Sequence, residues 1–430
     1  MNRGMCGHIA GAGSRWATLV LVATVWAPLA RAQVVDVTST TMLRLKPDWR
    51  AGDTRTGFWG TELVGLSVRK VEVAGVDDLN VQFSAWGQLS SIQNSIYTGT
   101  TADIDLLYIQ GALFSRHLQL TLGRQLISGG AARVLQLDGV NATVMFGKGF
   151  GITGYAGAPV VTQFHYSAGE FAFGGRAFWR PSYGSEIGVS FLEIITSSIL
   201  SRQDVGMDGR WVILPNLSVT ASGILNVQEA SFADADGTVT WQILPTVEVF
   251  ARGQHTSPNL FLPMTSIFSV FANTNRDAVG GGLSWQATPR FGLYGDYQRL
   301  WVDGGEKGDE AQVRATYRVT RRSTIGADAR FLFVPVNGVT DLRGWVSWAL
   351  SQQVRLSADV EGTVLSNPVN GKTGSVVGTA SATWAIGSGW SAMLSGSAGV
   401  TPFFEQVFTG TARIGYNFSN YGSPAKGAAK

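Results

Sequence analysis

Cysteine is almost absent from this sequence. The one cysteine, Cys6, precedes an apolar stretch from Trp16 to Leu29, and no other follows in the 430 residues. Basic residues come before that stretch, and the small residues of Ala30-Arg31-Ala32 come after it. This order is typical of a secretory signal peptide, so we predict that residues 1–32 are removed. The mature chain would then have no disulfide, thiolate or cysteine metal site.

Charged residues and long apolar runs are also scarce. Charged residues make up 15% of the chain, against about 25% in ordinary soluble domains. After the predicted signal there is no run of about 18 apolar residues, which excludes membrane-spanning helices. A chain this apolar without such helices is typical of a closed transmembrane β-barrel, in which all backbone polar groups pair with one another.

The sequence gives little indication of nucleic-acid binding or of catalysis. The predicted signal contains three arginines, so 30 basic residues remain against 30 acidic residues, and a neutral chain does not favour nucleic acid as a partner. The histidines that follow the signal are His117, His165 and His255. No nucleophile elbow, zinc-protease motif or metal-ligand spacing accompanies them. We therefore predict no enzyme activity, no cofactor and no metal.

Hydrophobicity alternates with a period of two along most of the chain. Between Val354 and Val364, apolar residues alternate with Arg355, Ser357, Asp359, Glu361 and Thr363. Turn signals such as Pro215-Asn216 and Gly387-Ser388-Gly389 recur about every 35 residues and join two alternating runs each. The pattern predicts an all-β, antiparallel up-and-down barrel over residues 33–418, with short periplasmic turns and longer extracellular loops. We expect 22 strands, within a range of 18 to 22, because the strands around Ile104 and Val140 are marginal.

Aromatic residues recur at one distance from the predicted turns. Trp211, Trp241 and Trp285 each lie four residues before a turn proline, on the apolar parity. A recurrent aromatic at one depth is typical of the girdle at a membrane interface. The residues predicted for this girdle are Trp179, Trp211, Trp241, Trp285, Trp348, Trp384, Tyr416 and Phe418.

Charged residues on the opposite parity are predicted to line the lumen. The basic ones are Arg176, Arg180, Arg210, Arg252, Arg314, Arg318, Arg330, Arg343, Arg355 and Arg413. The acidic ones are Asp204, Asp208, Asp234, Asp236, Glu248, Asp296, Asp328, Asp341, Asp359 and Glu361. The two sets are equal in number, which does not favour a strongly ion-selective pore. The alternative interpretation is that the same charges only brace the wall as cross-strand pairs, and the two interpretations are compatible.

One segment breaks the alternation. In the stretch from Leu118 to Gln125, strict parity directs Arg124 toward lipid, which is costly near the bilayer centre. Either a bulge at Gly123 redirects the side chain, or Arg124 lies at the membrane interface. The stretch Leu122-Gly123-Arg124-Gln125 and the later Leu135-Gln136-Leu137-Asp138-Gly139 resemble a pattern of porin-like barrels of the alginate-export type. That resemblance implies passage of polysaccharide or small solutes through an arginine-rich lumen.

The last predicted strand carries Ala412, Ile414, Tyr416 and Phe418 on one parity. It resembles the terminal aromatic signal of outer-membrane barrels, which implies recognition by the barrel-assembly machinery and insertion into outer-membrane lipid. Residues 419–430 are predicted to form a flexible tail. An apolar, irregular piece near Ser257 to Asp277 is predicted to fold inward, or to extend a strand.

These features predict an integral protein of the Gram-negative outer membrane. The first functional hypothesis is a porin-like channel for hydrophilic solutes. The second is a conduit that exports polysaccharide together with periplasmic partners, and the third is a barrel that anchors the envelope. A plugged transporter is disfavoured, because the strand pattern begins almost at the mature amino terminus.

Overall fold

In a computed structural model, the chain forms one sheet of 22 antiparallel strands. The structure describes residues 34–48, 55–91, 99–160, 170–196, 198–260, 274–302, 305–334, 337–403 and 407–420. The predicted signal peptide, the predicted tail beyond residue 420 and residues 261–273 of the apolar piece lie outside this described part.

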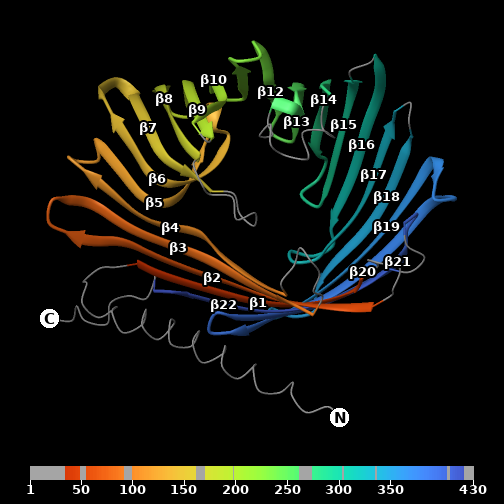
Figure 1. The fold of residues 1–430 in the computed structure, drawn as a ribbon. Coiled ribbons are helices and arrows are strands. Elements are labelled where there is room, and N and C mark those ends of the chain that lie inside the picture. Colours follow the sequence, from red (N-terminus) through yellow and green to blue (C-terminus); the bar gives the residue numbers. More distant parts are fainter. Residues whose placement is uncertain are drawn as a thin grey trace.

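The strands follow one another around the sheet in chain order (Figure 1). The first eleven are β1 (Val34–Asp48), β2 (Arg55–Val73), β3 (Val76–Ser90), β4 (Thr100–Leu113), β5 (Leu118–Ser128), β6 (Val134–Met145), β7 (Phe150–Pro159), β8 (Glu170–Ser182), β9 (Ser185–Thr196), β10 (Ile199–Leu214) and β11 (Leu217–Asn226). The others are β12 (Ser231–Leu244), β13 (Val247–Thr256), β14 (Arg276–Gln286), β15 (Phe291–Val302), β16 (Glu306–Arg318), β17 (Thr324–Phe333), β18 (Val339–Ala349), β19 (Val354–Val369), β20 (Lys372–Gly387), β21 (Trp390–Val400) and β22 (Val407–Ser419). The described connections also contain the short 3-10 helices η3 (Gly130–Ala132), η4 (Gly147–Gly149) and η5 (Pro258–Leu260).

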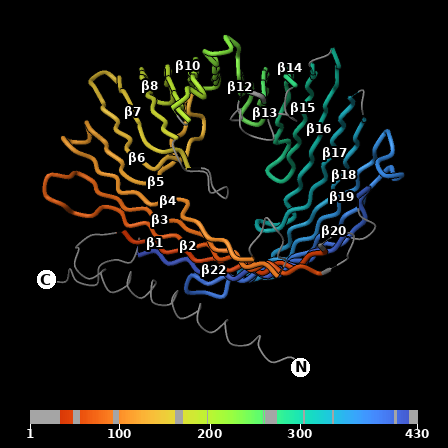
Figure 2. The backbone as a smooth tube through the Cα atoms, viewed as in Figure 1, coloured from red at the N-terminus to blue at the C-terminus, as the bar shows by residue number. Residues whose placement is uncertain are grey.

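The sheet closes because its first strand has a partner on each side. In β1, Thr41 lies opposite Glu62 of β2 and also opposite Ile414 of β22. Figure 2 shows the two chain ends of the sheet, red and blue, running side by side. Closure leaves no strand edge with unpaired backbone groups, as lipid requires. The prediction of a 22-stranded up-and-down barrel is confirmed.

Short connections occur at the predicted turns. Pro215-Asn216 joins β10 to β11, for example, and Ser388-Gly389 joins β20 to β21. The marginal segments are also strands, since Ile104 lies in β4 and Val140 in β6. Within the described residues, no helix is long and apolar enough to span a membrane.

Candidate functional site

The two faces of the sheet differ in chemistry. In β16, Arg314 lies opposite Tyr294 of β15 and Asp328 of β17, whereas its neighbour Val313 lies opposite Gly295 and Ala329. We call the face that carries Arg314 the charged face, and the face that carries Val313 the apolar face. Large apolar side chains on the apolar face are about half exposed, as for Leu342 at 55%. Within the described residues, the apolar face therefore has no protein layer over it.

The segment between β5 and β6 identifies the inner face. Its short helix η3 contacts β9, β10 and β11, and the Ala131 backbone N–H donates a 2.8 Å hydrogen bond to Ser190 Oγ. Ser190 lies opposite Arg176, so η3 packs on the charged face. The segment must pass β7 and β8 to reach β9 from β5. This path is short only on the concave side of the barrel wall. The charged face is thus the inner face of the barrel.

An apolar cluster holds this folded-back segment, which we call the tip (residues 128–134). Ile127, Ala131, Leu137, Tyr155 and Leu192 are all buried in the cluster. Their strands, β5, β6, β7 and β9, lie close together on this side of the barrel. The tip is therefore packed against the inner wall. A cavity of about 330 Å³ beside it is lined by both polar and apolar residues of β5 to β9.

Buried charges continue from the tip along the inner wall. Asp204 is completely buried; it accepts hydrogen bonds from Arg202 Nε at 2.6 Å and from Asn226 Nδ2 at 3.1 Å. Arg133, at the end of the tip, has its Nε 3.8 Å from Asp234 Oδ2. Burial lowers the pKa of Arg133 to about 10, so the side chain stays cationic at neutral pH. The alternation of the sequence predicted Asp204 and Asp234 as lumen residues, but it did not predict Arg202 or Arg133.

Six of the predicted lumen arginines form ion pairs across strands. Arg314 Nε is 2.8 Å from Asp328 Oδ2, and Arg252 Nη2 is 2.8 Å from Asp296 Oδ2. Arg176 holds two carboxylates at 2.6 Å, those of Asp208 and Glu186. The other pairs are Arg180 with Glu186, Arg330 with Glu310, and Arg343 with Asp359.

The remaining predicted lumen residues have no ion-pair partner in the described chain. The basic ones are Arg210, Arg318, Arg355 and Arg413, and the acidic ones are Asp236, Glu248, Asp341 and Glu361. Asp236 instead accepts a hydrogen bond from Ser222, and Asp341 accepts one from Thr363. Among the predicted lumen residues, those without an ion-pair partner are thus equal in number for the two signs.

Aromatic rings lie flat against the inner wall. A Cβ built on Gly326 would come within 2.2 Å of the Trp345 ring, and one on Gly151 within 2.3 Å of the Phe178 ring. Each glycine is the register partner of the ring above it, so the ring covers a strand position without a side chain. Arg343 lies 5.9 Å from the Trp345 centroid, and Arg180 lies 4.5 Å from that of Phe178.

The predicted girdle residues follow a regular offset on the apolar face. Trp211 pairs with Val219, and Val219 pairs with Val239, which lies two residues before Trp241. The same two-residue step links Trp179 to Trp211, and then Trp241, Trp285, Tyr317, Trp348, Trp384 and Tyr416 in turn. A constant step is expected of residues at one height in a barrel of tilted strands. We call this set the aromatic row; Phe418 lies two residues beyond it, next to the end of β22.

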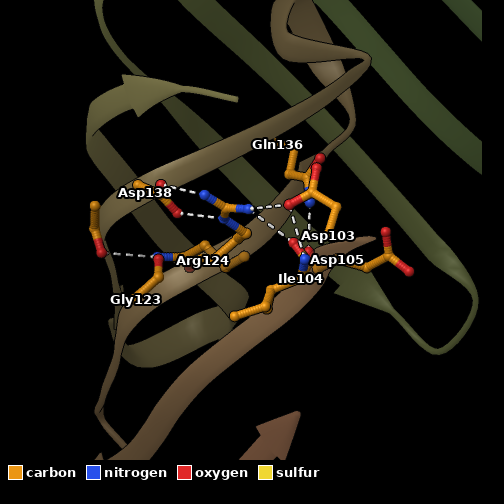
Figure 3. A network of polar contacts seen from close by, with 9 residues as sticks. Asp103, Ile104, Asp105, Gly123, Arg124, Gln136 and Asp138 are labelled. Atoms are coloured by element: carbon orange, nitrogen blue, oxygen red, sulfur yellow. Dashed lines mark hydrogen bonds and ion pairs between the residues drawn. The ribbon is translucent and has the colours of Figure 1, made fainter. Parts of the chain in front are cut away.

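Arg124 lies on the apolar face, where strict alternation directs it. Its Nε and Nη2 each donate to Asp138 at 2.8 Å, and its Nη1 donates to Asp103 at 3.1 Å and to the Ile104 carbonyl oxygen at 2.8 Å (Figure 3). The register continues through Gly123 on both sides, so the predicted bulge at that residue is wrong. A bulge lies instead in β4, between Ile104 and Leu106. It follows directly on Leu107, where the pairing of β4 with β5 ends.

No group of three or more histidine, cysteine or acidic residues in the described chain is arranged to hold a metal ion. Of the histidines, His255 contacts Asp277 at 2.7 Å and Ser257 at 3.1 Å through different ring nitrogens. His117 lies at the β4–β5 turn, and His165 lies outside the described residues.

Comparison with known proteins gives structural likeness without sequence likeness. No protein-family model and no curated protein matches the sequence. OccAB4 of Acinetobacter baumannii is 7% identical, with 91% of this chain and 99% of that chain covered and a TM-score of 0.45. OccK8 (OprE) of Pseudomonas aeruginosa is 11% identical, with 92% and 100% covered and a TM-score of 0.46. The translocation pore of the E. coli P pilus usher PapC is 10% identical, with 90% and 100% covered and a TM-score of 0.48.

None of these likenesses indicates a function for this chain, and the resemblance to alginate-export barrels stays a prediction. The fold itself decides the class and location of the protein. A closed antiparallel barrel with an apolar outer face and a charged inner face is the architecture of integral outer-membrane proteins. The chain is a closed 22-stranded β-barrel of the outer-membrane type.

Proposed function

We propose that this barrel is a water-filled channel for hydrophilic solutes. The observation that supports this function is the inner face, where charged side chains form cross-strand ion pairs while the outer face is apolar. Charged groups need water or partners, and side chains from a wall of this circumference do not fill the interior of a barrel. The predicted girdle aromatics would then contact the lipid interface, and the predicted lumen charges would contact water.

The solutes we propose are neutral or weakly charged, sugars included. Paired arginines and carboxylates neutralise one another locally, and the unpaired groups are equal in number for the two signs. Selection by charge needs a ring of one sign, which these residues do not provide. The flat rings of Phe178 and Trp345 add apolar surface to a polar wall, and Phe250 stacks on Tyr294 at 6.1 Å. Such surfaces suit the apolar faces of sugar rings.

Reconstitution in a planar lipid bilayer tests the channel. We expect discrete, stable conductance steps that scale with salt concentration and a reversal potential close to zero in a potassium chloride gradient. Addition of a neutral oligosaccharide should reduce the current through each channel. A folded barrel that stays silent at all voltages would contradict the proposal and favour an envelope-anchoring role.

A second candidate function is a conduit that exports polysaccharide with periplasmic partners. The observation that favours it is width, because 22-stranded barrels are normally plugged and the described residues form strands and their connections with no separate plug domain. Deletion of the gene should then remove a surface polymer and leave small-solute uptake intact. Unchanged surface polymer would exclude this second function.

A further inference from the structure

Four exposed arginines gather at two neighbouring short turns of the barrel. Arg290 is the last residue of the β14–β15 turn, and its carbonyl oxygen accepts a 2.7 Å hydrogen bond from the backbone N–H of Arg318. These two residues are therefore one step beyond the last register pair of β15 and β16. Arg321 and Arg322 lie in the next turn, between β16 and β17. All four residues are exposed.

These arginines have no acidic neighbours in their own turns. Residues 286–293 and 316–326, which contain the two turns, include no aspartate or glutamate. Toward the loops, Asp328 is already held by an arginine of its own. On the other side, Glu248 of β13 is two strands from Arg290, and no ion pair joins them. In the described residues, none of the four arginines has an ion-pair partner.

The pairing of Arg290 with Arg318 is unfavourable without an anion. Like charges directly opposite one another destabilise a pair of antiparallel strands. A guanidinium binds the oxygens of a phosphate or a carboxylate through two parallel N–H bonds. An oxyanion held between Arg290 and Arg318 would therefore replace their repulsion with charge-assisted hydrogen bonds. The described chain offers no carboxylate in this position, so the anion would come from solution.

The cluster opens to the lumen and not to lipid. Arg318 is on the charged face, whereas its neighbour Tyr317 belongs to the aromatic row on the apolar face. Arg355 of β19 is also on the charged face, opposite Ala349, which follows Trp348 of the same row. Arg318 and Arg355 are thus close to the height of the row, at the short-turn mouth of the barrel. In barrels of this type the short turns are periplasmic.

Small hydroxyl residues line the wall between these two arginines. Arg318 is opposite Thr324 of β17, and Thr324 is opposite Ser347 of β18. Both hydroxyl residues are half-buried. Arg318 and Arg355 are three strand spacings apart, about 14 Å along the wall. Long side chains on either side of short ones leave room for a solute of the size of a hexose, with hydroxyls beneath it.

We propose that this turn-end arginine site binds the phosphate group of a small sugar phosphate at the periplasmic mouth. Its residues are Arg290, Arg318, Arg321, Arg322 and Arg355. A phosphate monoester carries about 1.5 to 2 negative charges at neutral pH, so it suits paired guanidiniums better than the single charge of a carboxylate does. The inference rests on the proposed channel, because it names a class of solute for the same lumen.

Isothermal titration calorimetry on the folded barrel in an uncharged detergent tests the site. Glucose 6-phosphate should bind at low salt, and glucose should bind roughly tenfold more weakly because it lacks the phosphate. Arg290→Gln together with Arg318→Gln should weaken the binding of glucose 6-phosphate about fivefold. Arg321→Gln together with Arg322→Gln should weaken it too. This second pair lies in a turn, so it keeps the test decisive if the first variant folds poorly.

The matched control removes two arginines from the same end of the barrel. Arg69 is 2.6 Å from Asp36, and Arg116 is 3.7 Å from Asp78, so both have acidic partners within the chain. Arg69→Gln together with Arg116→Gln gives the same change in net charge as the first variant. It should change the affinity for glucose 6-phosphate by less than about twofold, because exposed charges at a distance are screened.

A lipid headgroup offers the same phosphate chemistry, and planar bilayers distinguish the two sources. Glucose 6-phosphate should reduce the single-channel current equally in phosphatidylcholine and in phosphatidylglycerol bilayers, because the site faces the lumen. A reduction that is lost in phosphatidylglycerol would show that an anionic headgroup occupies the site, and it would overturn the assignment to a soluble sugar phosphate.

Two results of the calorimetry would also overturn the proposal. The first is that glucose 6-phosphate does not bind, or binds no better than glucose. The second is an equal loss of affinity in the Arg290/Arg318 variant and in the Arg69/Arg116 control, which would show a general effect of net charge. A barrel that binds glucose 6-phosphate in detergent but conducts no current would contradict the proposed channel and support this site, so the two failures are distinct.

Discussion

At the scale of single residues, Gly123 has a conformation that other residues rarely adopt. Its φ is +114°, and a Cβ there would lie 2.2 Å from the Leu107 carbonyl oxygen. We expect Gly123→Ala to lower the free energy of unfolding by about 1–3 kcal/mol, because both the backbone and the neighbouring strand must shift. Urea unfolding in lipid vesicles measures this change. Gly223→Ala is the control, since no atom lies within 4 Å of its Cβ position, and an equal loss there would contradict the explanation.

Arg176 is the residue on which two inner-face carboxylates depend. Its side chain is 16% exposed and pairs with Asp208 and Glu186. Arg176→Met would leave Asp208 without a guanidinium and Glu186 with Arg180 as its remaining partner, so we expect a loss of about 2 kcal/mol, reduced by partial hydration. Arg318→Met removes an arginine with no ion-pair partner in the described chain and should change stability by less than about 0.5 kcal/mol. If urea unfolding gives the same loss of unfolding free energy for both variants, the ion pairs of Arg176 do not stabilise the barrel.

At the scale of elements, the tip depends on apolar packing rather than on its own short helix. Leu137 is fully buried in the cluster under it, so Leu137→Ala should cost about 2–5 kcal/mol, part of it as detachment of the tip from the wall. Detachment would expose Arg133 to trypsin, and we expect faster cleavage at that bond. Leu342→Ala, on the exposed apolar face, should leave the cleavage rate unchanged. A cleavage rate that Leu137→Ala does not raise would show that the tip is held in another way.

The strands and short turns could be predicted because their signals are local. Alternation from Val354 to Val364 and the proline at Pro215 need no knowledge of the rest of the chain. The tip could not be predicted, since Ala131 meets Ser190 only after the intervening strands have formed. Alternation directed Arg124 to the apolar side, but it could not identify Asp103 and Asp138 as the partners of this side chain.

At the scale of the whole molecule, the balance of unpaired charges should decide ion selectivity. Replacement of Arg210, Arg318, Arg355 and Arg413 by glutamine would leave unpaired carboxylates alone on the proposed lumen wall. We expect the reversal potential in a salt gradient to move toward cation selectivity. Amide substitutions at Asp236, Glu248, Asp341 and Glu361 should move it the opposite way. If neither set moves the potential, these side chains do not line the conducting path.

The pairing of β1 with β22 joins segments from opposite ends of the polypeptide, as in the contact of Val37 with Phe418. Translation and export deliver the first of these segments long before the last, so the ring has a gap until the carboxyl end arrives. Contacts between such distant segments form slowly, and unpaired edges invite wrong partners in the meantime. We therefore expect the amino-terminal strand edge of such a chain to need protection until the final strand is available.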